Sequence, residues 1–139
     1  MSAKLNLKDL RDFKVLKVLV LETDYYASQT INSYLAWDRR TRVVHLADTI
    51  ESVVAYVRHA DRTEWPDVVV LDALATGTPS ELARLVELIE NTIPNVLTLV
   101  LDRQFNIETI RAVERVGANG YLLRNEIQIR LASAICWAR

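Results

Sequence analysis

The sequence predicts an α/β fold in which an open, doubly wound parallel sheet of five strands carries helices on both faces. Short apolar runs alternate five times with segments whose apolar residues recur at helical spacing. The runs are continuous rather than alternating, which is typical of strands buried on both faces. Right-handed crossovers then place helices on both sides of the sheet. At 139 residues the chain is too short for a closed eight-stranded barrel, which needs roughly 200 or more.

The five units follow one another along the chain. The expected strands are residues 17–21, 43–46, 68–71, 96–101 and 120–123. The expected helices cover residues 27–37, 50–57, 79–89, 107–116 and, after an opening at Asn125 or Glu126, a last segment that reaches Trp137. Residues 1–15 form an N-terminal extension, and residues 16–139 form one domain by the usual size prior.

Three helix boundaries have recognisable signals. Thr78 is a good N-cap, because Pro79 follows at the first helical position and Glu81 stands three residues after the cap. Asp48 with Glu51 three residues later resembles a capping box. Gly117 ends the fourth helix.

Composition excludes several classes of function. The net charge of −1 gives no reason to expect a nucleic-acid surface, and no apolar run approaches the ~18 residues of a membrane span. The single cysteine, Cys136, and the absence of a signal peptide indicate a cytoplasmic protein. Residues 22–26, after the first strand, contain no glycine, which excludes a dinucleotide fingerprint or a P-loop.

Acidic residues end three of the expected strands. Asp72 closes the third apolar run, Glu22 follows the first and Asp102 follows the fourth. In an open parallel sheet, ligands bind beyond the carboxyl ends of the strands. We therefore expect these three carboxylates to converge on one site.

Three segments carry a resemblance to a known family: VLVLETD at 18–24, PDVVVLD at 66–72 and GANGYLLRNE at 117–126. In this order and spacing they resemble the receiver domains of bacterial response regulators, most closely the subfamily with a C-terminal helix-turn-helix. The resemblance covers about residues 16–138. It implies a flavodoxin-like sheet with strand order 2-1-3-4-5.

The resemblance also implies a chemistry. Asp72 matches the aspartate that accepts a phosphoryl group from a histidine kinase or a small acyl phosphate. The family uses Mg²⁺, for which Glu22, Asp24 and Asp72 are the candidate carboxylate ligands, with the Leu74 carbonyl. Tyr121 matches the switch aromatic on the fifth strand, or is an ordinary strand aromatic. No enzymatic activity is expected beyond phosphorylation of the domain itself.

Several residues depart from the family pattern. Thr23 stands where a carboxylate should ligate the metal, so Mg²⁺ binding is expected to be weak or absent. Asp102 replaces the switch Thr/Ser, and at ~4 Å it would repel an anion by ~4 kcal/mol at an effective dielectric of ~20. Arg124 replaces the Lys that the family carries at the end of the fifth strand, and it is expected to form a bidentate pair with Asp102.

Three functions remain open after these comparisons. The leading hypothesis is an atypical receiver domain that acts as a protein-interaction module, with impaired or absent phosphorylation at Asp72. The first alternative is a working Mg²⁺-dependent phosphoacceptor of a two-component system. The second is a module that binds a small ligand in the strand-end crevice. Asp72 and Asp102 also admit a plain interpretation as solvated loop acids.

The last helix suggests self-association. Its inward stripe is expected to be Ile127, Leu131, Ala134 and Ile135. Ile129 and Cys136 lie nearly opposite this stripe and Trp137 flanks it. A helix on a sheet needs one apolar face only. We therefore expect a homodimer through this helix and its neighbours, the fourth helix and fifth strand, or contact with a following domain.

Overall fold

The computed structural model describes residues 14–127 and 130–138. The strands are β1 (Leu16–Leu21), β2 (Thr41–Ala47), β3 (Val68–Asp72), β4 (Leu97–Asp102) and β5 (Gly120–Leu123). The helices are α2 (Tyr25–Trp37), α3 (Ile50–His59), α4 (Pro79–Thr92), α5 (Ile107–Arg115), α6 (Arg124–Ile127) and α7 (Leu131–Ala138), with short 3₁₀ turns η1 (Arg62–Glu64) and η2 (Ala73–Thr76). Within these residues no helix is long and apolar enough to cross a membrane.

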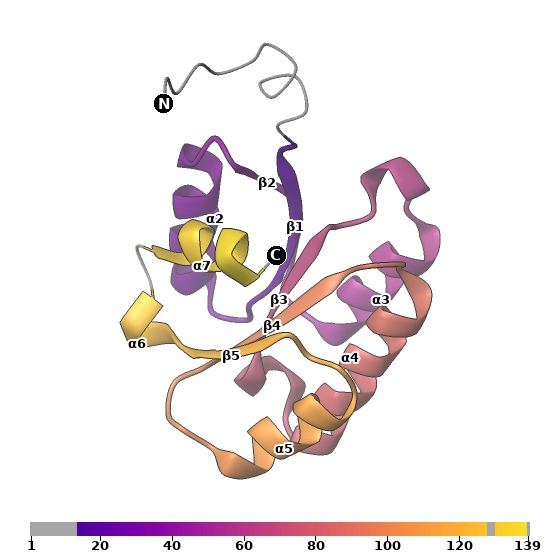
Figure 1. Ribbon diagram of the computed structural model, residues 1–139, viewed down its shortest axis with the longest axis vertical. Coiled ribbons are helices and arrows are strands. Elements are labelled where there is room, and N and C mark those ends of the chain that lie inside the picture. The colour runs from indigo at the N-terminus through magenta and orange to yellow at the C-terminus, as the bar shows by residue number, and fades with distance from the viewer. Residues whose placement is uncertain (1–13, 128–129, 139) are drawn as a thin grey trace, which may run out of the picture.

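The five strands form one sheet in the order β2-β1-β3-β4-β5, and every neighbouring pair is parallel (Figure 1). The predicted fold class and strand order are therefore confirmed. Because all strands run in the same direction, their carboxyl ends lie at one edge of the sheet. This edge positions the candidate site.

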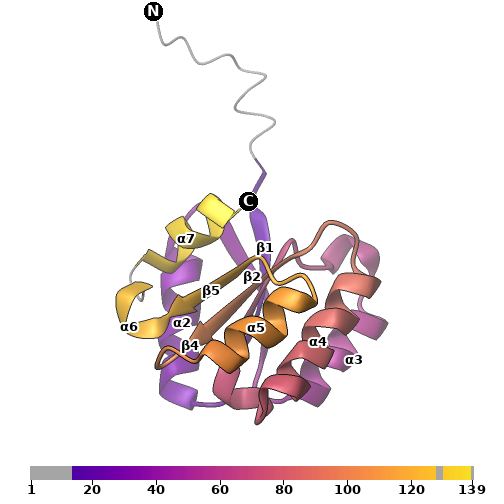
Figure 2. The same cartoon turned by 60° about the horizontal axis from the view of Figure 1, so that its bottom comes forward.

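Helices cover both faces of the sheet, as predicted. Helices α2 and α7 pack on one face, and α3, α4 and α5 pack on the other (Figures 1 and 2). Successive β3 side chains alternate between the two cores: Val68 and Val70 face α2 and α7, while Val69 and Leu71 face the other three helices. All four are fully buried. Two apolar faces on one strand explain why the sequence runs are continuous.

An acid stands at each end of this apolar run. Asp67 precedes β3, and its carboxylate accepts hydrogen bonds from the backbone N–H of Lys17 (2.8 Å) and from Nζ of Lys14 (2.8 Å). Asp72 ends the strand and is 1% exposed. The polar ends of β3 are therefore occupied by carboxylates with different surroundings.

The helix signals are partly confirmed. Thr78 caps α4, with its side chain accepting a hydrogen bond from the Glu81 N–H at 3.1 Å. Gly117 follows α5 with φ +101°, a conformation that favours glycine. The capping role predicted for Asp48 is wrong. Thr49 caps α3 instead and accepts from the Ser52 N–H at 3.1 Å, because the helix begins at Ile50, as expected, and the N-cap is the residue directly before it.

The last helical segment differs from the prediction, because it forms two helices, α6 and α7, rather than one. In α7 the buried residues are Leu131, Ala132 and Ile135, while Ala134 is only partly buried. Cys136 packs against the α2–α7 core rather than opposite it, since it lies one turn beyond Ala132 on the same face. Residues 1–13 and Ile129, and the side chains of Ile127 and Trp137, lie outside the described residues.

We expect the two neighbouring polar residues before α3 to differ in their contribution to stability. Thr49→Ala should lower the free energy of unfolding by about 1 kcal/mol, because it removes an N-cap acceptor. Asp48→Ala should change it by well under half of that. Urea unfolding followed by circular dichroism measures both, and an equal loss in the two variants would contradict the assigned cap.

Candidate functional site

The carboxyl edge of the sheet brings four charged side chains together. Glu22 follows β1, Asp72 ends β3, Asp102 ends β4 and Arg124 follows β5. The three acids are buried, with exposed fractions of 1%, 1% and 7% in that order. The predicted convergence of strand-end acids follows from the parallel sheet. Buried carboxylates require compensation, so their partners decide what the site does.

Arg124 provides that compensation for two of the acids. Its Nη2 atom forms an ion pair with Oε1 of Glu22, and its Nη1 atom lies 3.8 Å from Oδ1 of Asp72. Its side chain is 13% exposed and that of Glu22 is completely buried. Burial lowers the pKa of Arg124 from its usual value, but an arginine starts so high that it stays a cation at neutral pH. The site therefore contains a resident positive charge.

Asp72, the candidate phosphoacceptor, lies at the start of the short turn η2. Its Oδ1 atom accepts a 3.4 Å hydrogen bond from the Leu74 N–H, and its Oδ2 atom has no hydrogen-bond partner among the described residues. Burial raises the pKa of Asp72, and the Leu74 N–H and Arg103 oppose that rise. The charges of Asp102 and Asp24 raise it further. The carboxylate is thus held in place through one oxygen only.

The predicted bidentate pair between Asp102 and Arg124 is wrong. Oδ2 of Asp102 accepts a 2.6 Å hydrogen bond from the Tyr121 hydroxyl, and Oδ1 accepts one from the Arg103 N–H at 2.9 Å. Burial and the Asp102 hydrogen bond raise the pKa of Tyr121 to about 12. The tyrosine satisfies Asp102 from the same strand that precedes Arg124. The guanidinium is therefore left to pair with Glu22 and Asp72.

Tyr121 is tied to the loop between β4 and α5. Its hydroxyl oxygen accepts a 3.1 Å hydrogen bond from the Asn106 N–H and lies 3.0 Å from the Gln104 carbonyl oxygen. Its ring packs against the core on the α3–α5 side of the sheet. Tyr121 and Asp102 are thus hydrogen-bonded to each other, whereas the ion pairs of Arg124 are with Glu22 and Asp72.

The candidate metal ligands are not grouped around one position. Asp24 caps α2, with Oδ1 accepting from the Ala27 N–H at 3.0 Å, and its side chain is exposed. Among residues 14–127 and 130–138, no three His, Cys, Asp or Glu side chains lie within reach of a single metal ion. Thr23 is exposed and offers only a neutral hydroxyl. A guanidinium already neutralises Glu22 and approaches Asp72, so the residues present do not fit a Mg²⁺ site.

Arg103 is a further charged residue that the sequence patterns did not single out. It follows Asp102, is exposed, and lies close enough to Asp72 to lower the pKa of that carboxyl. The feature of the sequence that could have identified Arg103 is its position directly after Asp102, an acid at a strand end.

Solved structures similar to this chain share its fold. The signal receiver domain of the response regulator NarL from Mycobacterium tuberculosis aligns with a TM-score of 0.75 and 17% identity, covering 88% of this chain and 94% of that chain. A response regulator from Thermotoga maritima aligns with a TM-score of 0.74 and 19% identity, over 90% and 98%. A CheY-like receiver domain protein from Methanospirillum hungatei JF-1 gives 0.73 and 14%, over 89% and 93%.

These likenesses define a class at the level of fold. The chain has the flavodoxin-like fold of response-regulator receiver domains, as the sequence resemblance predicted. No protein-family model and no curated protein sequence matches it. Since a fold does not fix a function, the chemistry must be argued from the site.

We expect Arg124 to be the main stabilising cation of the site. Arg124→Met leaves Glu22 and Asp72 buried without a counter-charge, which should lower the free energy of unfolding by about 3–5 kcal/mol at pH 7. Acidification to pH 5 should reduce the deficit, because protonation removes the uncompensated charges. Urea unfolding of both proteins at both pH values tests this. A loss below 1 kcal/mol, as for the exposed control Arg58→Met, would contradict the ion-pair assignment.

The Tyr121–Asp102 hydrogen bond should be visible in the pH dependence of stability. Tyr121→Phe should lower the free energy of unfolding at pH 8 by about 1–3 kcal/mol, since it removes a hydrogen bond to a buried carboxylate. The pKa of Tyr121 is raised to about 12 in the folded state, so its stabilising contribution is complete below about pH 10 and lost toward pH 12. The difference between the two proteins should therefore shrink over that window. The matched variant Tyr26→Phe, at an exposed tyrosine, should show no such change.

Proposed function

We propose that this chain is an atypical receiver domain that acts as a protein-interaction module, with impaired or absent phosphorylation at Asp72. The observation that carries the proposal is the position of Arg124, whose guanidinium pairs with Glu22 and lies 3.8 Å from Asp72. A permanent internal cation takes the role that an exchangeable metal ion has in the family that the sequence resembles.

The ion pairs disfavour transfer of a phosphoryl group. In a phosphorylating receiver, Mg²⁺ would offset the charge on the phosphoryl oxygens. Here Thr23 supplies no charge for a metal, and Arg124 repels a second cation from Glu22 and Asp72. Asp102 adds a buried anion at the end of the neighbouring strand, where it opposes an incoming phosphate. Mg²⁺ binding is therefore expected to be weak or absent.

The switch aromatic is also held without a phosphoryl group. Tyr121 has a buried carboxylate as its partner, so its hydroxyl is fixed in the unphosphorylated chain. A ligand shifts a conformational equilibrium only through different affinities for the two states. A network that is already satisfied by Asp102 favours one state of β4, β5 and the loop before α5.

An apolar rim supports an interaction role. Five of the seven large apolar side chains that are exposed in the described part of the chain follow the carboxyl ends of β1, β3 and β4. They are Tyr25, Tyr26, Leu74, Phe105 and Ile107. The rings of Tyr25 and Tyr26 are in edge-to-face contact, with centroids 5.6 Å apart. Exposed apolar groups gathered at one edge are typical of protein-binding surfaces.

The partners follow from this surface and from the earlier predictions. We expect cytoplasmic signalling proteins, a histidine kinase among them, to bind this edge. Self-association through α7, α5 and β5 stays a prediction. Nucleic acid and membrane partners are not expected of this segment.

A working phosphoacceptor is the alternative that one observation favours. Oδ2 of Asp72 has no hydrogen-bond partner among the described residues, so one oxygen is available as a nucleophile. The two functions differ in whether Asp72 gains a phosphoryl group.

We expect the unmodified protein to gain no stable phosphoryl group when incubated with acetyl phosphate and Mg²⁺. The combined variant Thr23→Asp, Asp102→Thr, Arg124→Lys should gain one, because it supplies a metal-ligating carboxylate and removes both the repelling anion and the paired guanidinium. Intact-mass spectrometry measures the addition, and Asp72→Ala in the combined variant is the control that should abolish it. Phosphorylation of the unmodified protein that is lost in Asp72→Ala would overturn the proposal in favour of the working phosphoacceptor.

A further inference from the structure

A cavity of about 560 Å³ lies beside the strand-end site, between α2, the ends of β4 and β5, and α7. Its apolar wall includes Ile31, Leu101 and Leu131, and its cationic groups are Arg103 and Arg124. Cavities of roughly 300–1,000 Å³ with mostly apolar walls and a few polar groups are typical of small-molecule sites. The cavity is thus large enough for an organic ligand.

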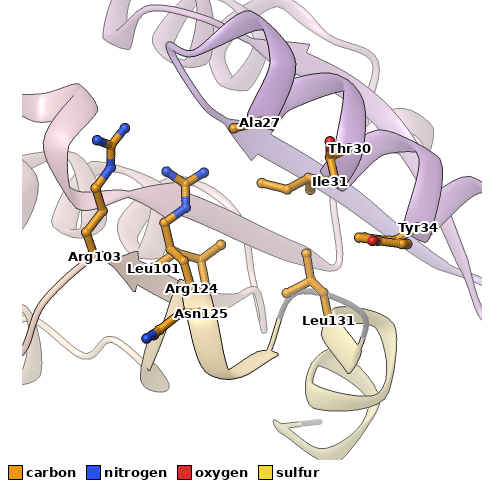
Figure 3. A pocket seen from close by; sticks show the side chains of 9 residues that line it. All are labelled: Ala27, Thr30, Ile31, Tyr34, Leu101, Arg103, Arg124, Asn125 and Leu131. Atoms are coloured by element: carbon orange, nitrogen blue, oxygen red, sulfur yellow. The ribbon is translucent and has the colours of Figure 1, made fainter.

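The two guanidinium groups of the cavity lie together on one side of it. Figure 3 shows the guanidinium groups of Arg103 and Arg124 on one side and Ile31, Tyr34 and Leu131 on the other. None of the described lining residues is acidic. A molecule that matches this arrangement has an apolar body and one anionic end.

The acidic side chains of the protein do not fully neutralise the positive charge of Arg103 and Arg124 at the cavity. Arg124 pairs with Glu22 and approaches Asp72, but Arg103 is an exposed side chain at the cavity. A guanidinium recognises a planar carboxylate through two parallel hydrogen bonds. Arg103 is therefore the group best placed to hold a carboxylate, with Arg124 beside it as a second positive charge.

We propose that this cavity binds a small amphipathic carboxylic acid. The carboxylate lies at Arg103 and Arg124, and the apolar body lies against Ile31, Leu101 and Leu131. The proposal does not rest on whether Asp72 is phosphorylated, because the cavity and its charges are present in either case.

Arg124 connects the cavity to the buried acids. The same guanidinium lines the cavity and pairs with Glu22 and Asp72. A bound carboxylate competes with these acids for one cation, so occupancy of the cavity changes the surroundings of Asp72. Coupling of this kind is reciprocal, and a change at Asp72 alters ligand affinity by the same factor.

The test uses ¹⁵N-labelled protein titrated with sodium octanoate, below the concentration at which it forms micelles, and followed by NMR. We expect saturable binding in the millimolar range, as for a ligand with few non-hydrogen atoms. The amide shifts should concentrate on α2, the ends of β4 and β5, and α7, and should extend to Glu22 and Asp72. Arg103→Gln should weaken binding about tenfold, which is the effect of losing one charge-assisted hydrogen bond.

Three controls separate the proposal from weaker interactions. Arg58→Gln removes an exposed arginine from α3, on the other face of the sheet, and should leave octanoate binding unchanged. Ile31→Phe should reduce binding by adding bulk to the apolar wall, and 1-octanol should bind at least about tenfold more weakly than octanoate because it lacks the charge. Inorganic phosphate should not reproduce the shifts.

The opposite results would overturn the proposal. They are octanoate shifts spread over the surface without saturation, equal binding by Arg103→Gln and the unmodified protein, or equal binding of octanol. Phosphate that produced the same shifts would show a simple anion site and exclude the amphipathic class. Each result can be obtained without a phosphodonor, so it is independent of the phosphorylation experiment.

Discussion

The carboxylates of Glu22 and Asp72, buried at the ends of adjacent strands, require a positive charge. Arg124 supplies it from the end of the edge strand β5. Removing an ion from water is expensive, and a buried pair is tolerated only when its partners stay in place. The pairing of Arg124 with Glu22 connects the end of β5 to the end of β1 across two intervening strands. Asp102 then depends on another donor, which is Tyr121. The arrangement of the whole carboxyl edge follows from which acid the guanidinium contacts.

The carboxyl edge combines the receiver-domain fold with ion pairs among the protein's own side chains. The sheet and its strand order are those of the receiver-domain fold, and beside Asp72 the guanidinium of Arg124 faces two buried carboxylates. These ion pairs, together with the Tyr121–Asp102 hydrogen bond, connect the ends of β1, β3, β4 and β5. The segments that follow these strand ends expose Tyr25, Tyr26, Leu74, Phe105 and Ile107.

The sequence predicted most of the fold because each strand is a continuous aliphatic run with helical spacing on either side. The strand order came from the family resemblance, since periodicity does not distinguish one parallel order from another. The capping error arose because Asp48 and Thr49 are both good caps, and only backbone geometry selects between them. The sequence placed Glu22, Asp72, Asp102 and Arg124 at strand ends, where the structure has them, but it did not predict how their side chains pair. Asp102 and Arg124 stand on neighbouring strands, yet a long arginine side chain reaches past its neighbour, and Tyr121 had already satisfied that acid.

The two-sided burial of β3 has a consequence for how the chain finds its alignment. Val68 to Leu71 contribute aliphatic side chains to both cores, so a slip of the strand by one residue would exchange one set of aliphatic groups for another. Burial alone distinguishes such a slip poorly. The register is selected instead by the two flanking acids, because Asp67 must meet the Lys17 N–H of β1 and Asp72 must lie near Arg124 after β5. A shift of β3 along its neighbours would place one acid among apolar side chains and separate the other from its partners. The two carboxylates therefore determine the register of the central strand.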